Sequence, residues 1–375
     1  MRRQNTDPVR VGHELLEAAG IEVNGPAPWD IQVHDDRLFE RALRDRELGL
    51  GEAYQDGWWD AERVDQFLER VQLADLRSAI RPSLGLLWLA TRARLTNRQS
   101  IGRARRNASA HYDIGNDLYE RMLDRRMVYS CGYWDNSSSL DAAQEAKLDL
   151  ICRKIGLKPG MRLLDIGCGW GGLAEYAATK YGANVVGITL AAEQEVVARE
   201  RCRDTTVEIR RQDYRDVVDT FDRVVSVGMM EHVGATNLAT FFEACDNALA
   251  PDGLMLHHTI GSNESKLRAD PWFDRYIFPG GVVPSLEQIS GAAAPRWIVE
   301  DVHNFGPDYD RTLMAWLANV DEAWSDLPAY DERFRRTWRY YLTASAASFR
   351  VRNLQLWQIV FRRSQQRTDV YRATR

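Results

Sequence analysis

One short stretch decides the fold: Arg162-Leu-Leu-Asp-Ile-Gly-Cys-Gly-Trp-Gly-Gly-Leu173. An apolar strand ends in a glycine-rich loop, and the loop opens a helix that we predict over Leu173–Tyr181. Glycines let the backbone turn tightly and approach a ligand, and a helix N-terminus offers unpaired N–H donors. This arrangement is typical of the first strand of a doubly wound sheet. A nucleotide-like cofactor binds there, beyond the carboxyl ends of the strands.

The loop alone does not choose the cofactor, because it also satisfies the dinucleotide fingerprint G-x-G-x-x-G. A NAD site places an acidic residue at the end of the next strand, here residues 184–188. No carboxylate follows that strand before Glu193, which disfavours a NAD-dependent dehydrogenase. Asp165 before the loop and the compactness of the loop favour S-adenosylmethionine, which lacks a pyrophosphate but carries a sulfonium and an amino-acid tail.

Length and composition indicate a globular protein with one large α/β domain and a smaller one. The chain has 375 residues, of which 45% are apolar, and no apolar run approaches the length of a membrane span. Residues 1–10 are polar, without the apolar core of a signal peptide. We therefore expect a cytoplasmic or peripheral protein. Five scattered cysteines give neither a disulfide framework nor a zinc pattern, and no metal is expected.

Positive charge is concentrated in two segments, although the net charge is −5. Residues 76–112 hold eight arginines and no acidic residue, and residues 333–375 hold eleven arginines and one aspartate. Such segments suit anionic phosphates, either in lipid headgroups or in nucleic acid, and a salt-bridged solvated face gives the same composition. The apolar residues at 84–89 favour a membrane surface for the first segment.

Strands and helices alternate after residue 108, which predicts a mostly parallel sheet of seven strands in the domain 108–375. The predicted strands are residues 161–166, 184–188, 207–211, 223–227, 253–260, 297–304 and 356–361. The predicted helices are residues 140–155, 173–181, 192–203, 238–249, 286–293, 309–324 and 330–351. Residues 1–90 are predicted to form a small α-rich domain, and residues 91–107 an Arg-rich linker.

Four residues with possible chemistry have ordinary interpretations when each is taken alone. Glu231 suits a helix cap, His258 a core histidine, Cys131 a small buried hydrophobe and Tyr309 a helix entry. Together, a buried glutamate, histidine and tyrosine can hold a small anion or position a base. The Asn/Asp-Pro-Pro-aromatic signature of amino-methylating enzymes is absent after the fourth strand. The acceptor is therefore expected to be an unactivated carbon.

At these residues the chain resembles the cyclopropane-fatty-acyl-phospholipid synthases, which are related to the mycolic acid cyclopropane synthases. The resemblance covers nearly the whole chain. It rests on residues 20–25, 48–52, 56–59, 111–117, 129–131, 162–173, 187–190, 212–216, 227–234 and 276–281. It implies a Rossmann-like class I methyltransferase domain. The N-terminal part favours the phospholipid-acting branch, because the mycolic acid enzymes resemble only the second domain.

The resemblance implies that S-adenosylmethionine donates a methyl group to the cis double bond of an acyl chain in a membrane phospholipid. The resulting carbocation loses a proton and the cyclopropane ring closes. The family holds a bicarbonate ion as the base. Its implied ligands are the side chains of Glu231, His258 and Tyr309, with backbone groups of Cys131 and Ile260.

The resemblance also assigns the cofactor-binding residues. Tyr112 and Ser130 belong near the methionine part, and Gly167 and Gly169 pass close to the cofactor. The ribose and adenosine side and the remainder of the cofactor are assigned to Thr189, Leu190, Gln194, Tyr214 and Val227.

By the same resemblance, residues 1–90 engage lipid, and the protein sits at the inner face of the cytoplasmic membrane. Nucleic acid is not an expected partner, and a homodimer is left open. Two alternatives remain: a synthase of methyl- or methylene-branched fatty acids, and a non-catalytic methyltransferase fold that binds membranes.

Overall fold

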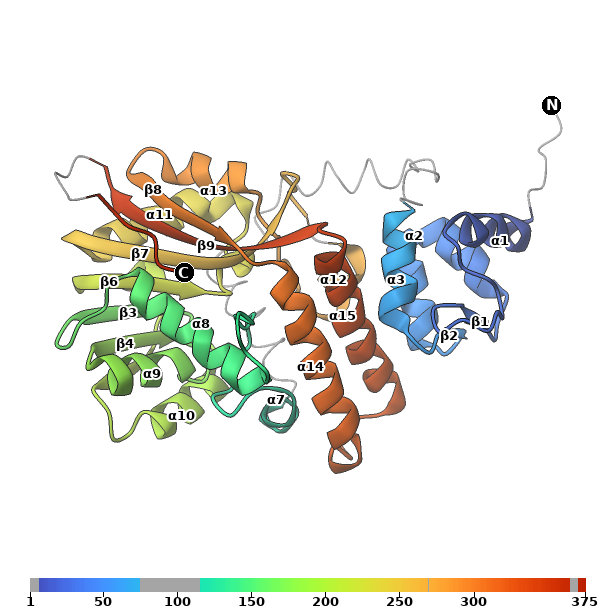
Figure 1. Ribbon diagram of the computed structural model, residues 1–375, viewed down its shortest axis with the longest axis horizontal. Helices are drawn as coiled ribbons and strands as arrows, with labels where there is room; N and C mark the ends of the chain where they lie inside the picture. The colour runs from blue at the N-terminus through green and yellow to red at the C-terminus, as the bar shows by residue number, and fades with distance from the viewer. Residues whose placement is uncertain (1–6, 75–114, 269, 365–369) are drawn as a thin grey trace.

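The computed structural model describes residues 7–74, 115–268, 270–364 and 370–375. The predicted linker 91–107, the first Arg-rich segment (residues 76–112) and Tyr112 all lie outside the described residues. The two helical layers, the sheet and the N-terminal helices can be followed in Figure 1.

The centre of the larger part is a seven-stranded sheet in the order β5-β4-β3-β6-β7-β9-β8. Its strands are β3 (Arg162–Ile166), β4 (Asn184–Thr189), β5 (Val207–Arg211), β6 (Phe221–Val227), β7 (Leu249–Ser262), β8 (Trp297–Asn304) and β9 (Leu354–Arg363). Neighbours from β5 to β7 pair in parallel, and β9 is antiparallel to both β7 and β8. The prediction of seven mostly parallel strands is confirmed.

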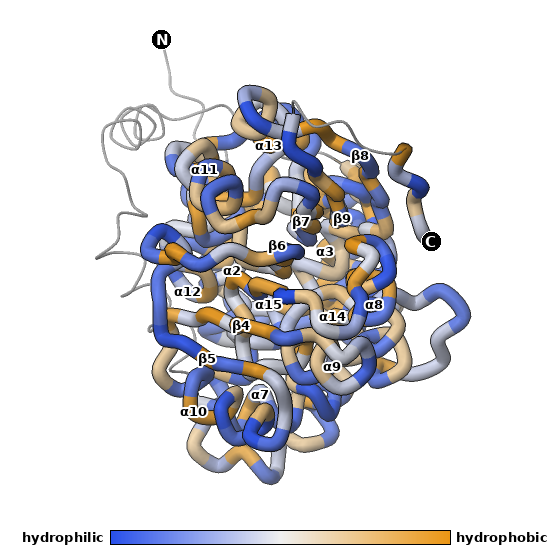
Figure 2. The backbone as a smooth tube through the Cα atoms, turned by 90° about the vertical axis from the view of Figure 1, so that its left-hand side faces the viewer, coloured by the Kyte–Doolittle hydropathy of each residue, from blue (hydrophilic) through white to orange (hydrophobic). Residues whose placement is uncertain are grey.

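Helices α8 (Leu140–Lys154), α9 (Gly172–Tyr181), α10 (Ala192–Arg201), α11 (Leu238–Ala248) and α13 (Leu286–Ala293) cover the two faces of this sheet. Helices α14 (Pro307–Ala323) and α15 (Glu332–Arg350) lie between the sheet and the N-terminal helices (Figure 1). All seven lie at the positions predicted from the sequence. Successive residues of a strand face opposite sides. Accordingly, Leu163 packs with α8 and α9, whereas Leu164 packs with α11 and α13. Hydrophobic stretches lie in the strands, and hydrophilic stretches gather in the outer loops (Figure 2).

Local sequence signals set several helix ends. Ser139 caps α8 by accepting a hydrogen bond from the backbone N–H of Ala142. Ser285 and Gln288 form a reciprocal capping box at the start of α13. Gly182 ends α9 in the left-handed region, with φ at 65°. These caps fix where each helix begins and ends relative to the carboxyl edge of the sheet.

The N-terminal part is mostly helical and packs on the larger part. It contains α1 (Pro8–Ala18), β1 (Gln32–Val33), α2 (Arg37–Gln55), β2 (Trp59–Asp60) and α3 (Val64–Leu73). Its core is continuous with that of α15 and of the short helix α12 (Pro271–Tyr276). The ring of Tyr340 lies 5.7 Å from that of Tyr54 and 4.7 Å from that of Trp272. Burial of aromatic rings from both parts therefore holds them together.

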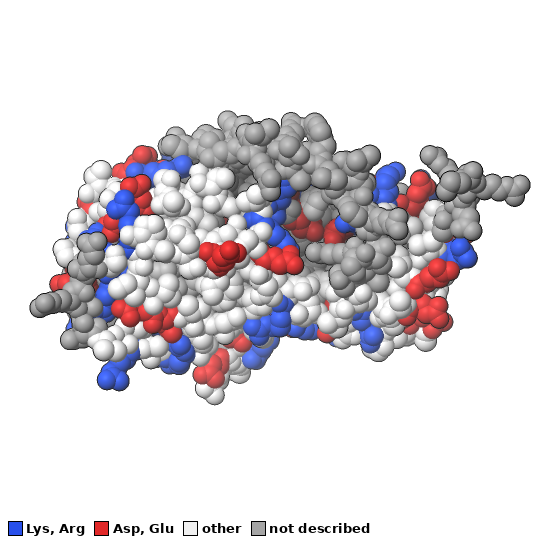
Figure 3. All heavy atoms as spheres, turned by 90° about the horizontal axis from the view of Figure 1, so that it is seen from above, with Lys and Arg blue, Asp and Glu red and all other residues white. Residues whose placement is uncertain are grey.

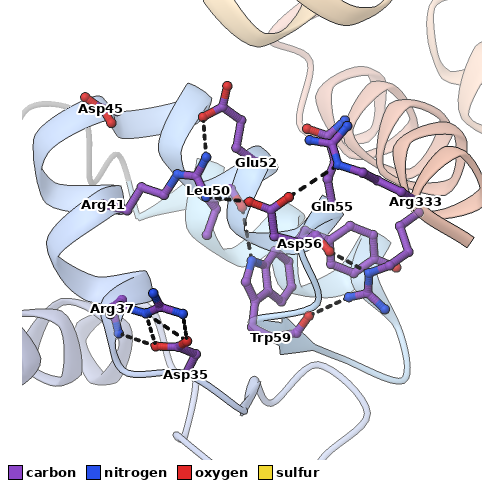
Figure 4. A network of polar contacts seen from close by, with 12 residues as sticks. Asp35, Arg37, Arg41, Asp45, Leu50, Glu52, Gln55, Asp56, Trp59 and Arg333 are labelled. Carbon is purple, nitrogen blue, oxygen red and sulfur yellow. Dashed lines mark hydrogen bonds and ion pairs between the residues drawn. The ribbon is translucent and has the colours of Figure 1, made fainter.

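Ion pairs add to this contact, and Figure 4 shows Asp56 of the N-terminal part paired both with Arg41 and with Arg333 of α15. Glu52 accepts hydrogen bonds from Arg41 at 2.6 Å, from Arg275 at 2.7 Å and from the Tyr276 hydroxyl at 2.8 Å. Arg41 also binds Asp56 at 2.8 Å. Glu52 thus joins α2 to α12, the helix that follows β7.

The arginines of the C-terminal segment are largely engaged within the molecule. Eight of them form ion pairs with acidic side chains: Arg333, Arg335, Arg336, Arg339, Arg350, Arg362, Arg363 and Arg375. Basic and acidic side chains are interspersed over the described part of the face in Figure 3. The salt-bridged interpretation therefore holds for this segment. No helix among the described residues has both the length and the apolar character needed to cross a bilayer.

Candidate active site

The glycine loop after β3 has the backbone geometry that its sequence predicts. Gly167 and Gly169 adopt φ values of 82° and 55°, which a side chain would strain. A Cβ atom at Gly167 would also lie 3.0 Å from Cγ of Met229. The loop is tied to β4, since the N–H groups of Gly167 and Cys168 both donate to the carbonyl of Ile188.

A cavity of about 170 Å³ lies against this loop, at the ends of β3, β4 and β6. It brings together eight residues that the sequence assigned to the cofactor: Ser130, Gly167, Gly169, Thr189, Leu190, Gln194, Tyr214 and Val227. The Thr189 hydroxyl donates to Oε1 of Gln194 at 2.9 Å, which fixes that side chain. The ninth, Tyr112, is outside the described residues.

Two ionisable residues that line this cavity are not among the cofactor-binding residues assigned from the sequence. Lys147 and Asp165 both line it, and each is at most 1% exposed. Burial lowers the pKa of Lys147 to about 8 and raises the pKa of Asp165 to about 7. A usable signal existed: Lys147 occupies an apolar-face position of α8, at helical spacing from Ala143 and Ile151.

A second cavity, of about 880 Å³, lies between the N-terminal helices and the larger part. Its walls are mainly apolar; α1, α2 and α3 supply one side, and α12, α15 and the end of β7 supply another. No local sequence pattern predicts a cavity of this size, because its wall is assembled from segments far apart in the chain. The two cavities share four lining residues: Tyr129, Ser130, Gly228 and His232.

The larger cavity is lined by four of the five residues predicted to hold the anion: Glu231, His258, Ile260 and Tyr309. Oε1 of Glu231 accepts a hydrogen bond from the Ile260 N–H at 2.6 Å. The fifth predicted residue, Cys131, is buried behind this wall and is not among the lining residues. Its thiol donates to the Gly132 carbonyl at 3.1 Å.

Two polar atoms of this group are buried and have no partner among the described residues: Oε2 of Glu231 and Nε2 of His258. The Gln358 amide nitrogen lies 3.3 Å from Nδ1 of His258; if it donates there, the imidazole proton is on Nε2. Burial raises the pKa of Glu231 and lowers that of His258 well below its usual range. Buried polar groups are normally paired, so this acceptor and this donor indicate a ligand position.

The strand order, the single reversed strand and the glycine loop at the carboxyl edge define a class I S-adenosylmethionine-dependent methyltransferase fold. The chain belongs to the mycolic acid cyclopropane synthetase family, whose sequence model matches residues 99–359. The resemblance inferred from the motifs is thereby confirmed.

Individual relatives extend over different parts of the chain. It is 51% identical over 355 residues to the cyclopropane-fatty-acyl-phospholipid synthase of Escherichia coli K12, covering 94% of this chain and 93% of that protein. It is 34% identical to the tuberculostearic acid methyltransferase UfaA1 of Mycobacterium tuberculosis, covering 96% of this chain and 88% of the relative. The mycolic acid cyclopropane synthase CmaA1, solved with SAH and CTAB, superposes with a TM-score of 0.65 at 32% identity. That match covers 68% of this chain and 97% of CmaA1.

Proposed function

We propose that this enzyme transfers a one-carbon unit from S-adenosylmethionine to the cis double bond of an unsaturated acyl chain in a membrane phospholipid and so forms a cyclopropane ring. The observation that carries the proposal is the junction of the two cavities. A small cavity beside the glycine loop, which has Lys147 and Asp165 in its wall, meets a large, mainly apolar one at Tyr129, Ser130, Gly228 and His232. An acyl chain in the large cavity can thereby reach the cofactor without passing through water.

The small cavity suits S-adenosylmethionine, and the SAH complex of CmaA1 supports this assignment. The cofactor supplies an electrophilic methyl group. The hydrogen-bonded side chains of Thr189 and Gln194 form one part of the cavity wall. Ser130 and Asp165 form another part.

The group around Glu231 suits bicarbonate, because Oε2 of Glu231 is an unpartnered acceptor and Nε2 of His258 is an unpartnered ring nitrogen facing the same cavity. Bicarbonate bound there supplies a base for the proton lost in ring closure. Tyr309 and the backbone of Cys131 and Ile260 remain its other proposed ligands. Ile260 contributes by holding Oε1 of Glu231, which leaves Oε2 for the anion.

The N-terminal helices support a lipid substrate. Leu16, Phe39, Phe67 and Leu68 are among the residues that they add to the wall of the large cavity. This wall makes residues 1–90 the proposed lipid-engaging unit. We place the enzyme at the inner face of the cytoplasmic membrane, where its substrate lies, as a peripheral protein.

The test is incubation of the pure protein with S-adenosylmethionine and vesicles of an unsaturated phospholipid, followed by mass spectrometry and proton NMR of the extracted lipid. A gain of one CH₂ with upfield ring-proton signals supports cyclopropanation. No gain with S-adenosylhomocysteine bound means a different acceptor. No gain and no binding favours the non-catalytic alternative.

The relationship to UfaA1 favours one second candidate, formation of a methyl- or methylene-branched chain from the same type of cation. A methyl branch completed by reduction is two hydrogens heavier than the ring. A methylene branch is isomeric with the ring, and its vinyl protons distinguish it by NMR. A gain of one CH₂ without ring signals therefore supports this candidate.

A further inference from the structure

Lys147 holds a buried ammonium group in the wall of the small cavity. Its side chain is 0% exposed, and Nζ donates a hydrogen bond to Oγ of Ser130 at 2.7 Å. Among the described residues Lys147 forms no ion pair, although the carboxyl groups of Asp124 and Asp165 are close enough to favour its charged form. A buried charge without a direct counter-ion is costly. Such a charge therefore calls for a functional explanation.

The bond from Lys147 constrains the hydroxyl of Ser130. A serine hydroxyl has one proton to donate, and that proton cannot point at a donor. No acceptor for it is present among the described residues, whereas its oxygen is occupied by Lys147. The backbone is held as well, because the Gln144 amide donates to the Ser130 carbonyl at 2.7 Å. Ser130 lines the cavity, so its hydroxyl is free to donate into it.

The opposite charge lies on the same cavity. Asp165, at the end of β3, has an Oδ2 atom that is buried and without a partner. The cavity wall thus carries a cation with a hydroxyl donor at one place and a carboxyl group at another. That pattern complements an α-amino acid, whose carboxylate and ammonium groups carry opposite charges.

We propose that Lys147 is a positioning residue that directs the Ser130 hydroxyl and makes the cavity select the carboxylate of the cofactor's methionine tail. The proposal rests on the proposed cofactor and adds the group that recognises one end of it. Lys147 acts through Ser130 and through its charge, and it takes no part in the transfer itself.

The test compares two ligands by isothermal titration calorimetry. S-adenosylhomocysteine carries the carboxylate, and S-adenosyl-3-thiopropylamine lacks only that group. In Lys147→Met we expect the affinity for S-adenosylhomocysteine to fall about 10-fold to 100-fold, the range for a hydrogen bond to a charged group. Affinity for the amine should stay within about twofold, because it makes no carboxylate contact. Lys158→Met, at an exposed lysine just after α8, should bind both ligands as the wild type does.

Ser130→Ala supplies the second variant, and it keeps the lysine. It should weaken S-adenosylhomocysteine selectively, and the double variant should lose little more than either single one, because the two residues act as a unit. Equal losses for both ligands, or no loss for either, would overturn the proposal. If Lys147→Met does not fold, the selectivity of Ser130→Ala decides. Failure of the wild type to bind S-adenosylhomocysteine would instead overturn the proposed cofactor.

Discussion

Glu231 and Ile260 form a half-satisfied contact: the Ile260 N–H donates to Oε1 of Glu231 at 2.6 Å, while Oε2 is buried without a partner among the described residues. Glu231 follows β6 and Ile260 lies in the neighbouring strand β7, so the fold itself sets this distance. One oxygen orients the side chain and the other faces a ligand position. An unpaired buried acceptor such as this Oε2 atom destabilises the fold by about 1–3 kcal/mol, which a bound ligand would offset.

Glu231→Gln should abolish most of the activity and keep the fold. The amide presents a donor or an acceptor where the anion site needs a carboxylate, and loss of an acid–base group typically lowers rates about 100-fold or more. Lipid product is measured by mass spectrometry and the melting temperature by calorimetry. Glu120→Gln, on the exposed side of α7 (Asn116–Met122), is the matched control. Full activity in Glu231→Gln would remove Glu231 from the site.

Ala344→Phe should block the lipid without disturbing the cofactor. Ala344 lies on α15 and lines the large cavity but not the small one. A phenyl ring there occupies space that we assign to the acyl chain. Turnover of phospholipid should fall at least about tenfold, while calorimetric affinity for S-adenosylhomocysteine stays unchanged. Unchanged turnover would mean that the acyl chain lies elsewhere.

Glu52→Gln should weaken the contact between the N-terminal helices and α12. Glu52 has three partners, and its side chain is only 10% exposed. Loss of hydrogen bonds to a charged group costs about 1.5–3 kcal/mol. Denaturant unfolding measures this loss. Asp35→Asn, which disrupts a more exposed pair with Arg37, should lower the free energy of unfolding far less. Equal effects of the two variants would contradict a structural role for Glu52.

Acid should destabilise the protein through two buried histidines of β7. Burial lowers the pKa of His257 from 6.5 to about 3 and that of His258 well below 6.5. For His257, the unfolded chain binds the proton between pH 6.5 and about 3 and the folded chain does not; for His258 the same difference begins at pH 6.5. The free energy of unfolding therefore falls as the pH falls, by up to about 1.4 kcal/mol per pH unit for each histidine. His257→Gln should reduce the change in the free energy of unfolding between pH 6 and pH 5, measured by urea unfolding. The same change in the variant as in the wild type would contradict this role of His257.

Much of the sheet and of the smaller cavity could be predicted from local sequence. Most strands of the larger part carry an apolar run, and the glycine loop marks the carboxyl edge of the sheet. β7 extends from Leu249, four residues before the predicted start: Leu249 pairs with Phe221 of β6, and after a shift in register the pairing resumes at Leu254. Tertiary pairing of this kind leaves no local signal.

The rest of the site depends on contacts between distant segments. Glu231, His258 and Tyr309 each looked ordinary alone, and only the family resemblance grouped them. The position of Lys147 on the apolar face of α8 predicts burial, but no local pattern places it on the cofactor cavity. The large cavity needs α1–α3 placed against α15, which aromatic packing decides and no sequence window contains.

The most direct test of cyclopropanation uses S-adenosylmethionine with a trideuterated methyl group and vesicles of an unsaturated phospholipid. Cyclopropanation predicts a lipid product that gains one carbon and two deuterons and shows upfield ring-methine protons, since one deuteron is lost when the ring closes. Retention of all three deuterons, a gain of two deuterons without ring-methine signals, or no transfer by protein that binds S-adenosylhomocysteine would contradict it.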